Sequence, residues 1–419
     1  MSSNGTDRRV VVTGLGVVTP VGNDLETFWK NLISGRCGID KITSFDASPF
    51  DTQIAGEVKN FDPAPAFPSP KEVRRADRYS QFGVYAGWQA LVDSGLDLEK
   101  ENCDEIGVII GSGIGGLETT ALQIKTLAER GPSRLSPFMI PMLISNMASG
   151  LFSMYNHLRG PNFATCSACA TANHAIGEAW RSIKMGDAQI MFAGGAEAAV
   201  VPIGIGGFCA MKAMSTRNDD PQRASRPFDK ERDGFIMGEG AGVVMLEELE
   251  HAKKRGAKIY CEIVGYGNTA DAHHLTAPAP DGEGAARCMK MALRQNGLRP
   301  EDISYINAHG TSTPQGDVCE TRAIKTVFGE HAKKVAVSST KGATGHMLGA
   351  AGAVEMSVCA LAIIHGIIPP TINQQVPDPE CDLDYVPNTA REMKVNAIIN
   401  NSFGFGGHNA SIAAKKFVG

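Results

Sequence analysis

The sequence has no long hydrophobic run. No stretch reaches the roughly 18 consecutive apolar residues of a membrane-spanning helix, and the segment Met1 to Arg9 is short and polar, without the apolar core of a signal peptide. We therefore expect a cytoplasmic protein without membrane insertion. A transit peptide removed before this sequence starts would leave no trace, so an organellar stroma or matrix stays open as a location.

An excess of positive charge is also absent. The 419 residues include 40 Lys and Arg against 45 Asp and Glu, a formal net charge of -5, and the pI is near 6.1. Nucleic acids and anionic membranes attract proteins through a positive field, so neither is an expected partner. An acidic protein partner must meet a local basic patch.

Cysteine spacings typical of zinc or redox sites are scarce. Only Cys166 and Cys169 form a Cys-x-x-Cys pattern. A redox dithiol would need a thioredoxin-sized βαβ context and a zinc site a second Cys or His pair, and neither is visible, so no metal is expected. The other cysteines are interpreted as core residues: Cys37, Cys103, Cys209, Cys261, Cys288, Cys319, Cys359 and Cys381.

Short apolar runs that end in glycine define the expected architecture. Val10 to Val12, Ile106 to Ile110 and Ile190 to Ala193 are typical of buried strands before tight turns. Helical spacing of apolar residues runs from Ala172 to Ile183 and from about Gly349 to Ile364, each with a glycine stop. This alternation predicts an α/β protein.

Similar strand and glycine patterns recur along the chain. Residues 106–113 resemble residues 303–310, and residues 188–195 resemble residues 397–407. We therefore predict a duplicated α/β unit with halves at 1–255 and 256–419. The loop-rich interval from Met211 to Gly240 is predicted to be functional, because long ordered loops are seldom idle.

Cys169 is the strongest candidate for a nucleophile. It stands between a predicted strand end and the helix from Ala172, where free backbone N–H groups and the helix dipole lower a thiol pKa. The same N–H groups can hold an oxyanion. A buried helix-capping cysteine is the alternative interpretation.

Two of the ten histidines have a local context that suits catalysis. His309 follows the predicted strand Ile303 to Ile306, at the strand end where α/β folds bind ligands. His346 is surrounded by small residues that allow a substrate to approach. Each could instead be a structural histidine. The others are interpreted as local hydrogen-bonding residues, among them His174, His273, His274 and His408.

Two further features adjoin these histidines. Lys341 lies in a segment without surface charge, so we expect it to be partly buried and paired, with Glu320 as the partner. Phe403 and Phe405 alternate with glycines, which suits a hydrophobic gate and a second oxyanion-hole N–H. The alternative for the two phenylalanines is a strand end in the core.

In this order, the motifs resemble those of the elongating β-ketoacyl-acyl carrier protein synthases, condensing enzymes of the thiolase superfamily. The resemblance runs from Val-Thr-Gly-Leu-Gly-Val-Val-Thr-Pro-Val-Gly at Val12 to Phe-Gly-Phe-Gly-Gly at Phe403. It implies a thiolase-like fold of two similar halves in five α-β-α-β-α layers, and a homodimer. It places the nucleophile at Cys169, with Cys166 as a neighbour lining the site.

The resemblance also implies a mechanism. Cys169 accepts an acyl chain from phosphopantetheine on acyl carrier protein, with no cofactor of its own, and the N–H groups of Cys169 and Phe405 hold the oxyanion. His309 and His346 then stabilise the enolate formed when malonyl-acyl carrier protein loses carbon dioxide.

Other positions receive roles by the same resemblance. Lys341 counts with Cys169, His309 and His346 among the catalytic residues, and supporting roles fall to Glu320, Asp317 and Phe403. Substrate contacts fall to Thr276, Thr311 and Thr313, and Ile114 limits chain length. Carrier-protein docking falls to Arg74, Arg75, Arg134 and Lys212, for which ordinary surface charge is the alternative. Gly342 departs from the family, which commonly has Ser there.

Three rival functions remain. A thiolase would use a second active-site cysteine near the C-terminal glycine turn, where this chain has His408 and Asn409. A polyketide-type ketosynthase shares the same chemistry. A chain-length-factor-like dimer partner keeps the fold but lacks the nucleophile, whereas Cys169 is present.

Overall fold

The computed structural model describes residues 8–419, so residues 1–7 of the polar N-terminal segment lie outside it. The main sheet has ten strands in the order β10-β9-β13-β14-β8-β1-β7-β6-β4-β5. Their bounds are β1 Val10–Val18, β4 Ile106–Gly111, β5 Asn162–Phe163, β6 Ile190–Glu197, β7 Gly240–Glu248, β8 Cys261–Ala270, β9 Tyr305–Asn307, β10 Ala336–Ser338, β13 Ala397–Gly404 and β14 His408–Lys415. Two small sheets pair β2 (Ile39–Lys41) with β3 (Ile54–Gly56), and β11 (Ile367–Ile368) with β12 (Arg391–Glu392).

The helices alternate with these strands. They are α1 Leu25–Ile33, α2 Pro70–Val73, α3 Arg78–Ser94, α4 Leu117–Arg130, α5 Met139–Leu143, α6 Met147–Asn156, α7 Thr171–Met185, α8 Pro202–Ala210, α9 Leu249–Lys254, α10 Glu283–Arg294, α11 Pro314–Phe328, α12 Lys341–Thr344 and α13 Ala351–His365. The two helices predicted from apolar spacing correspond to α7 and α13, which end at Gly186 and Gly366 in the left-handed conformation. The α/β prediction is confirmed.

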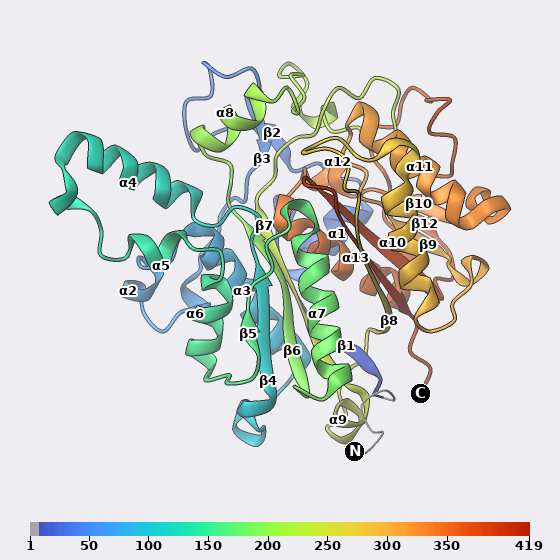
Figure 1. Cartoon of the computed structure of the whole chain (residues 1–419), viewed down its shortest axis with the longest axis horizontal. Helices are drawn as coiled ribbons and strands as arrows, with labels where there is room; N and C mark the ends of the chain where they lie inside the picture. Colours follow the sequence, from blue (N-terminus) through green and yellow to red (C-terminus); the bar gives the residue numbers. More distant parts are fainter. Residues whose placement is uncertain (1–7) are drawn as a thin grey trace.

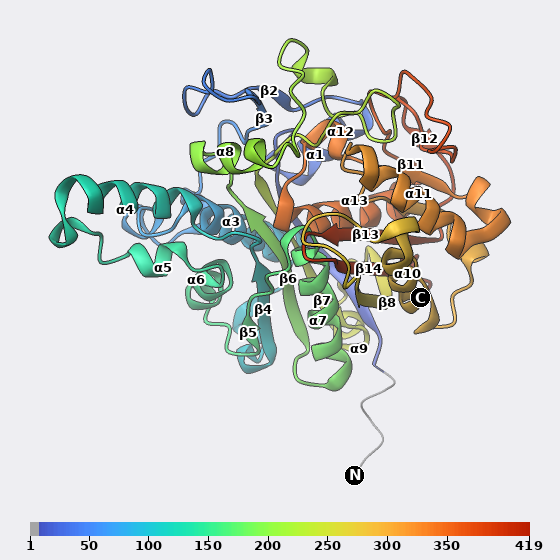
Figure 2. The ribbon, with the colours of Figure 1, turned by 45° about the horizontal axis from the view of Figure 1, so that its top comes forward.

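The pattern of parallel and antiparallel strand pairing is the same when the main sheet is followed inward from either edge. In β5-β4-β6-β7-β1 the first three strands are parallel and the last two pairings antiparallel, and β10-β9-β13-β14-β8 repeats this pattern. The two sets meet where Val10 to Val12 pair with Cys261 to Ile263. Figures 1 and 2 show most of the blue-to-green part of the chain on the left and the orange-to-red part on the right, with α1 near the orange elements.

Helices α7 and α13 lie between the two sets of strands. Their apolar residues share one buried cluster with alternate residues of strands from both sets, such as Val244 and Ile398. Separate clusters cover the outer faces: α3 and α6 pack on one set, and α10 and α11 on the other. This alternation follows the two-residue period of a strand, and it gives five layers of helix, sheet, helix, sheet and helix.

One apolar segment has the length and hydropathy of a membrane-spanning helix. Leu348–His365, which includes α13, has a mean hydropathy of 1.7 over 18 residues, so by length and composition alone it could cross a membrane. However, 89% of it is buried inside the protein. A helix packed between two sets of strands is covered on all sides and is therefore apolar all round, which is why this segment resembles a spanning helix although Glu355, Ser357 and His365 interrupt its apolar run.

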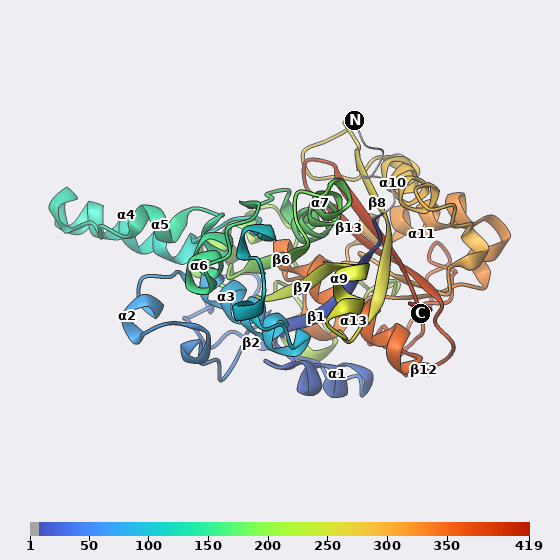
Figure 3. The ribbon, with the colours of Figure 1, turned by 90° about the horizontal axis from the view of Figure 1, so that it is seen from below.

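The eight cysteines interpreted as core residues are buried or half-buried, and all ten cysteines are free. Helices α4 and α5 project away from the rest of the molecule in both Figure 1 and the view from below in Figure 3.

In both halves a strand glycine packs directly against a helix backbone. Replacing either glycine should therefore destabilise the protein to a similar extent. A Cβ on Gly16 of β1 would lie 1.9 Å from the carbonyl oxygen of Ala86 on α3, and a Cβ on Gly265 of β8 would lie 1.9 Å from that of Ala292 on α10. We expect Gly16→Ala and Gly265→Ala each to lower the free energy of unfolding by about 1–3 kcal/mol or more. Urea unfolding checks this. Gly207→Ala, where a Cβ meets nothing within 4 Å, is the control, and equal stability of all three variants would contradict the packing argument.

Candidate active site

Three reactive side chains from separate parts of the chain meet in the structure. Cys169 lies in the 3-10 turn Ala168–Ala170 before α7, His309 follows β9, and His346 follows α12. The sulfur of Cys169 lies 2.9 Å from Nε2 of His346. The two imidazole rings have their centroids 5.3 Å apart and are nearly perpendicular, at 85°. The predicted convergence of these residues is present.

Local geometry presents Cys169 at the start of α7. Ala168 has a φ of +49°, a conformation that costs energy for a residue with a side chain. The turn is held by Ser167, whose N–H donates to Thr171 Oγ1 (2.9 Å) and whose hydroxyl lies 2.6 Å from His174 Nδ1. His174 also bonds Asn268 (3.2 Å), so its predicted role as a local hydrogen-bonding residue is confirmed.

Two backbone N–H groups are directed at the sulfur, those of Cys169 and Phe405. The approach of Phe405 depends on Gly404, where a Cβ would lie 2.7 Å from the carbonyl oxygen of Ser167 and 3.1 Å from the nitrogen of Cys169. Glycine therefore allows the end of β13 to reach the nucleophile turn. The pair of donors suits an oxyanion on a carbon bonded to the sulfur.

The charge state of the site differs from the expectation of an acidic thiol. Burial raises the pKa of Cys169 to about 12, although Lys341 and the two N–H groups lower it. Burial and Lys341 also hold the pKa of His309 and of His346 well below the usual value. The resting site is therefore a neutral thiol beside neutral imidazoles, and the position before a helix does not outweigh desolvation.

The predicted partner of Lys341 was wrong. Its ammonium pairs with Glu355 on α13, and both side chains are almost fully buried, at 1% and 2% exposure. The carboxylate of Glu320 instead accepts the backbone N–H groups of His309 (2.9 Å) and Gly310 (2.8 Å). Glu320 is already occupied by these donors, whereas α13 brings Glu355 directly against Lys341.

Two buried carboxyl groups hold the loop that carries His309. Glu320 also accepts the amide of Asn401 at 3.2 Å, and burial raises its pKa to about 7. Asp317 accepts the N–H groups of Phe228 and Ser312, and burial raises its pKa to about 6. Both act on the backbone of this loop, so they shape it without touching the sulfur.

A cavity of about 610 Å³ opens onto the sulfur. Thr311 and Thr313, whose hydroxyl oxygens lie 3.1 Å apart, are among its lining residues. The other predicted residues that line it are Cys169, His309, His346, Glu320, Phe403, Phe405, Thr276 and Ile114. Lining residues that the sequence did not single out are Phe208, Phe235, Met211 and Leu348. Met211 and Phe235 lie in the long loop predicted to be functional, which was the only signal for them.

The comparisons with known proteins cover almost the whole chain. Residues 7–252 match the family described as Beta-ketoacyl synthase, N-terminal domain, and residues 260–375 match Beta-ketoacyl synthase, C-terminal domain. The chain belongs to the beta-ketoacyl synthase family.

Relatives within the family are similar over their full length. The chain is 55% identical over 415 residues to "3-oxoacyl-[acyl-carrier-protein] synthase 2" of Synechocystis sp., with 99% of this chain and all of the relative covered. It is 51% identical over 417 residues to the protein of the same name from Staphylococcus aureus, with both chains fully covered. The predicted family is therefore confirmed.

Solved structures of ketosynthases share the fold. A Beta-ketoacyl synthase from Burkholderia phymatum matches with a TM-score of 0.91, and the ishigamide ketosynthase/chain length factor with 0.92. Each is 35% identical, and each comparison covers 98% of this chain and 100% of the other. The predicted thiolase-like fold of two similar halves is confirmed.

Of the docking residues predicted for this ketoacyl synthase, one lies at the cavity. Lys212 is exposed and lines it. Arg74 and Arg134 are exposed but are not among the lining residues. Arg75 bonds Glu72 at 2.9 Å and stacks on Phe138 at 4.4 Å, so its guanidinium is already engaged.

The structure also places three other residues singled out in the sequence, Cys166, His408 and Gly342. Cys166 is exposed and does not line the cavity, so the prediction that it lines the site was wrong. His408 is also exposed and absent from the lining. The glycine at 342 has a packing reason, because a Cβ there would lie 2.9 Å from a side-chain carbon of Ile372.

The sulfur and two imidazole nitrogens of this ketoacyl synthase could also ligate a soft cation. The three atoms lie within 4.8 Å of one another. However, the charge of Lys341 acts on all three groups and opposes a cation at the same place. The donor set therefore fits acid–base chemistry better than a resident metal.

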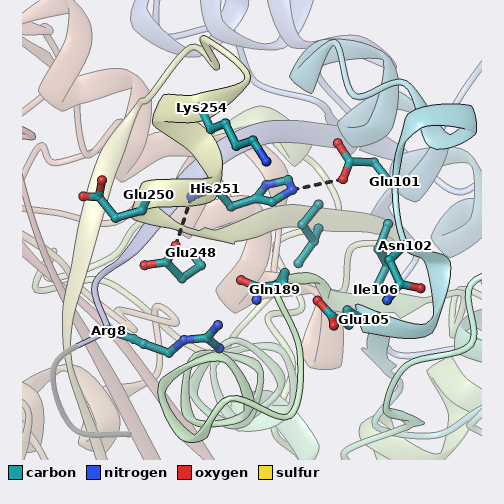
Figure 4. Close-up of a pocket in the computed structure, with 11 residues that line it drawn as sticks. Arg8, Glu101, Asn102, Glu105, Ile106, Gln189, Glu248, Glu250, His251 and Lys254 are labelled. Atoms are coloured by element: carbon teal, nitrogen blue, oxygen red, sulfur yellow. Dashed lines mark hydrogen bonds and ion pairs between the residues drawn. The ribbon is translucent and has the colours of Figure 1, made fainter. Parts of the chain in front are cut away.

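A second cavity, of about 530 Å³, lies elsewhere (Figure 4). His251 bonds Glu101 at 3.0 Å and Glu247 at 2.6 Å, and Glu248 caps α9 by accepting the N–H of His251. His251 is thus bonded to two lining residues, Glu101 and Glu248, and these contacts hold α9 in place.

The buried pair of Lys341 and Glu355 predicts a large effect of removing one charge. Glu355→Gln leaves the ammonium without a countercharge, and we expect a loss of about 3–5 kcal/mol in the free energy of unfolding. Urea unfolding measures it. Glu250→Gln, which removes a carboxylate that is 75% exposed, should have almost no effect. A Glu355→Gln variant as stable as this control would rule out the pair as a stabilising contact.

The raised pKa of Glu320 predicts a pH dependence of stability. The folded protein binds this proton more tightly than the unfolded chain, so the contribution is complete below the unfolded value of 4.5 and is lost as the pH rises through about 7. Between about pH 5 and pH 8 we expect a decline of roughly 1–3 kcal/mol, with a smaller slope in Glu320→Gln. Urea unfolding at several pH values checks this. The exposed Glu330→Gln should keep the full slope, and an unchanged slope in Glu320→Gln would refute the assignment.

Proposed function

We propose that this protein is a 3-oxoacyl-[acyl-carrier-protein] synthase that elongates acyl chains by decarboxylative Claisen condensation. The observation that carries the proposal is the 2.9 Å contact between Cys169 and His346, with His309 beside it and two N–H groups aimed at the sulfur. The full-length relatives with that name support it.

The first half-reaction transfers the acyl chain. His346 Nε2 takes the proton of Cys169, and the resulting thiolate attacks the thioester carbonyl carbon. The oxyanion is held by the N–H groups of Cys169 and Phe405. When the intermediate collapses, the carrier thiol leaves with the proton from His346, and the acyl chain remains on Cys169.

The second half-reaction forms the carbon–carbon bond. The malonyl thioester loses carbon dioxide, His309 and His346 donate hydrogen bonds to the enolate oxygen, and the carbanion attacks the acyl carbonyl. Cys169 leaves as a thiolate and takes up one proton from solvent. Among the described residues, neither Nδ1 has a hydrogen-bonding partner. His346 is thus not locked in one tautomer, so its Nε2 can accept a proton first and donate a hydrogen bond later.

The cavity lining supports the substrate roles that the family resemblance implies. Thr311 and Thr313 would contact the pantetheine arm, Thr276 would lie near the malonyl group, and Phe405 would move to admit the acyl chain. The substrates arrive on acyl carrier protein, with Lys212 at the cavity as a contact, and no further cofactor takes part. A solved ketosynthase that is 35% identical, with a TM-score of 0.90, is in complex with its type II PKS acyl-carrier protein.

The proposal includes a homodimer. Large apolar side chains are exposed on the projecting helices, including Leu122 (56%) and Leu127 (47%) on α4 and Ile140 (59%) on α5. Phe163 is 44% exposed on β5, the last strand at one edge of the main sheet. Exposed apolar patches and open strand edges are typical of protein interfaces, and a second copy would cover both.

A polyketide ketosynthase is the second candidate, because solved ketosynthases of that kind share the fold. Their identity is 35%, against 51–55% for the fatty-acid-type relatives, which favours the first proposal. A noncatalytic chain-length factor is disfavoured because Cys169 is in place.

Acyl loading tests the proposal. We expect the protein mixed with acyl-acyl carrier protein to gain the mass of one acyl chain on Cys169, and to release carbon dioxide on addition of malonyl-acyl carrier protein. Intact-protein and peptide mass spectrometry measure the first step. Cys169→Ala should load nothing, while Cys166→Ala, which removes the exposed cysteine three residues away, should load normally. Acyl mass on another cysteine, or condensation by Cys169→Ala, would refute the mechanism.

A further inference from the structure

A buried carboxylate outside the mechanism joins two segments of the cavity wall. Glu197, the last residue of β6, is 0% exposed. Its Oε1 accepts the hydroxyl of Ser112 (2.8 Å) and the N–H of Ile114 (3.1 Å). Its Oε2 accepts the N–H groups of Gly113 (2.8 Å) and Gly349 (3.0 Å). Four hydrogen bonds from two distant parts of the chain thus end on one carboxylate.

All four partners of Glu197 donate a hydrogen bond to its carboxylate oxygens. Three are backbone N–H groups, and the hydroxyl of Ser112 accepts the N–H of Gly115 at 2.9 Å, so its hydrogen is free to point at the carboxylate. A protonated carboxyl or an amide would place a hydrogen against one of these donors. Burial raises the pKa of Glu197 and these four hydrogen bonds lower it, since burying a charge costs energy unless it is compensated; only the carboxylate form matches all four donors.

The two segments lie on the wall of the reaction cavity. Gly113 and Ile114 come from the loop after β4, and Leu348 comes from the turn after His346. They touch each other closely, because a Cβ on Gly349 would lie 2.5 Å from the nitrogen of Gly113 and 2.7 Å from Glu197 Oε2. Glu197 therefore sets the spacing between Ile114 and Leu348.

We propose that Glu197 is a positioning residue that determines which acyl-chain lengths this protein accepts. It holds Ile114 and Leu348 in fixed positions on the wall of the cavity, and so fixes the room available to an acyl chain there. This inference rests on the proposed function, since it assigns the acyl chain to that cavity.

The test compares Glu197→Gln with the unmodified protein. Rates of acyl loading and condensation are measured with acyl-acyl carrier proteins of increasing saturated chain length. We expect the ratio of kcat/KM for long and short chains to change by about fivefold or more, the effect of roughly one lost hydrogen bond.

Two further variants make the result specific. Ser112→Ala removes one of the four donors, and should shift the same ratio in the same direction by less. Glu57→Gln is the matched control. The buried carboxylate of Glu57 likewise accepts hydrogen bonds, from Thr43 and Ser44, but Glu57 does not line the cavity. It should keep the chain-length ratio of the unmodified protein. If Glu197→Gln does not fold, the chain-length ratio of Ser112→Ala tests the proposal instead.

The outcomes separate this inference from the proposed function. An unmodified protein that loads no acyl chain on Cys169 refutes the proposed function itself. If the unmodified protein loads chains, and folded Glu197→Gln and Ser112→Ala keep its chain-length ratio, the role of Glu197 is refuted.

Discussion

The structure depends on keeping a cysteine buried beside a neutral imidazole. Burial alone would hold Cys169 as an unreactive thiol, yet the same burial keeps His346 unprotonated and able to accept a proton. At 2.9 Å the two groups can share that proton. Desolvation thus suppresses the free thiolate in the resting protein and preserves the base that can generate it when a thioester is bound.

The two-half architecture explains how these groups come together. Helices α7 and α13 occupy equivalent places in the halves, and each is preceded by a 3-10 turn, one with Cys169 and the other directly after His346. A Cβ on Gly352 at the start of α13 would lie 2.8 Å from the side-chain oxygen of Asn173 on α7. The starts of the two central helices therefore touch, so a nucleophile from one half meets a base from the other.

Much of this arrangement could be predicted from the chain, because its signals are local. The spacing of apolar residues and a terminal glycine define α7 and α13, and short motifs identify Cys169, His309 and His346. The partner of Lys341 could not be read in this way. Glu320 and Glu355 are both acidic residues near Lys341 in the sequence, and only the packing of α13 decides which one faces the ammonium. The thiol pKa has the wrong expected sign for a related reason: the position before a helix is visible in sequence, but the depth of burial is not.

The role of Glu197 could not be predicted from the sequence either. Its strand has no motif that marks the residue, and its four partners lie 83 to 152 positions away along the chain. The carboxylate acquires its importance only when the loop after β4 and the turn before α13 arrive on either side of it. The duplicated halves supply the chemical groups, and buried charges such as Glu197 and the pair of Lys341 and Glu355 fix the distances between them. Because such charges are costly unless every partner is in place, they fix the backbone around Cys169, and a condensing enzyme needs this fixed frame to bring two thioesters to a single sulfur.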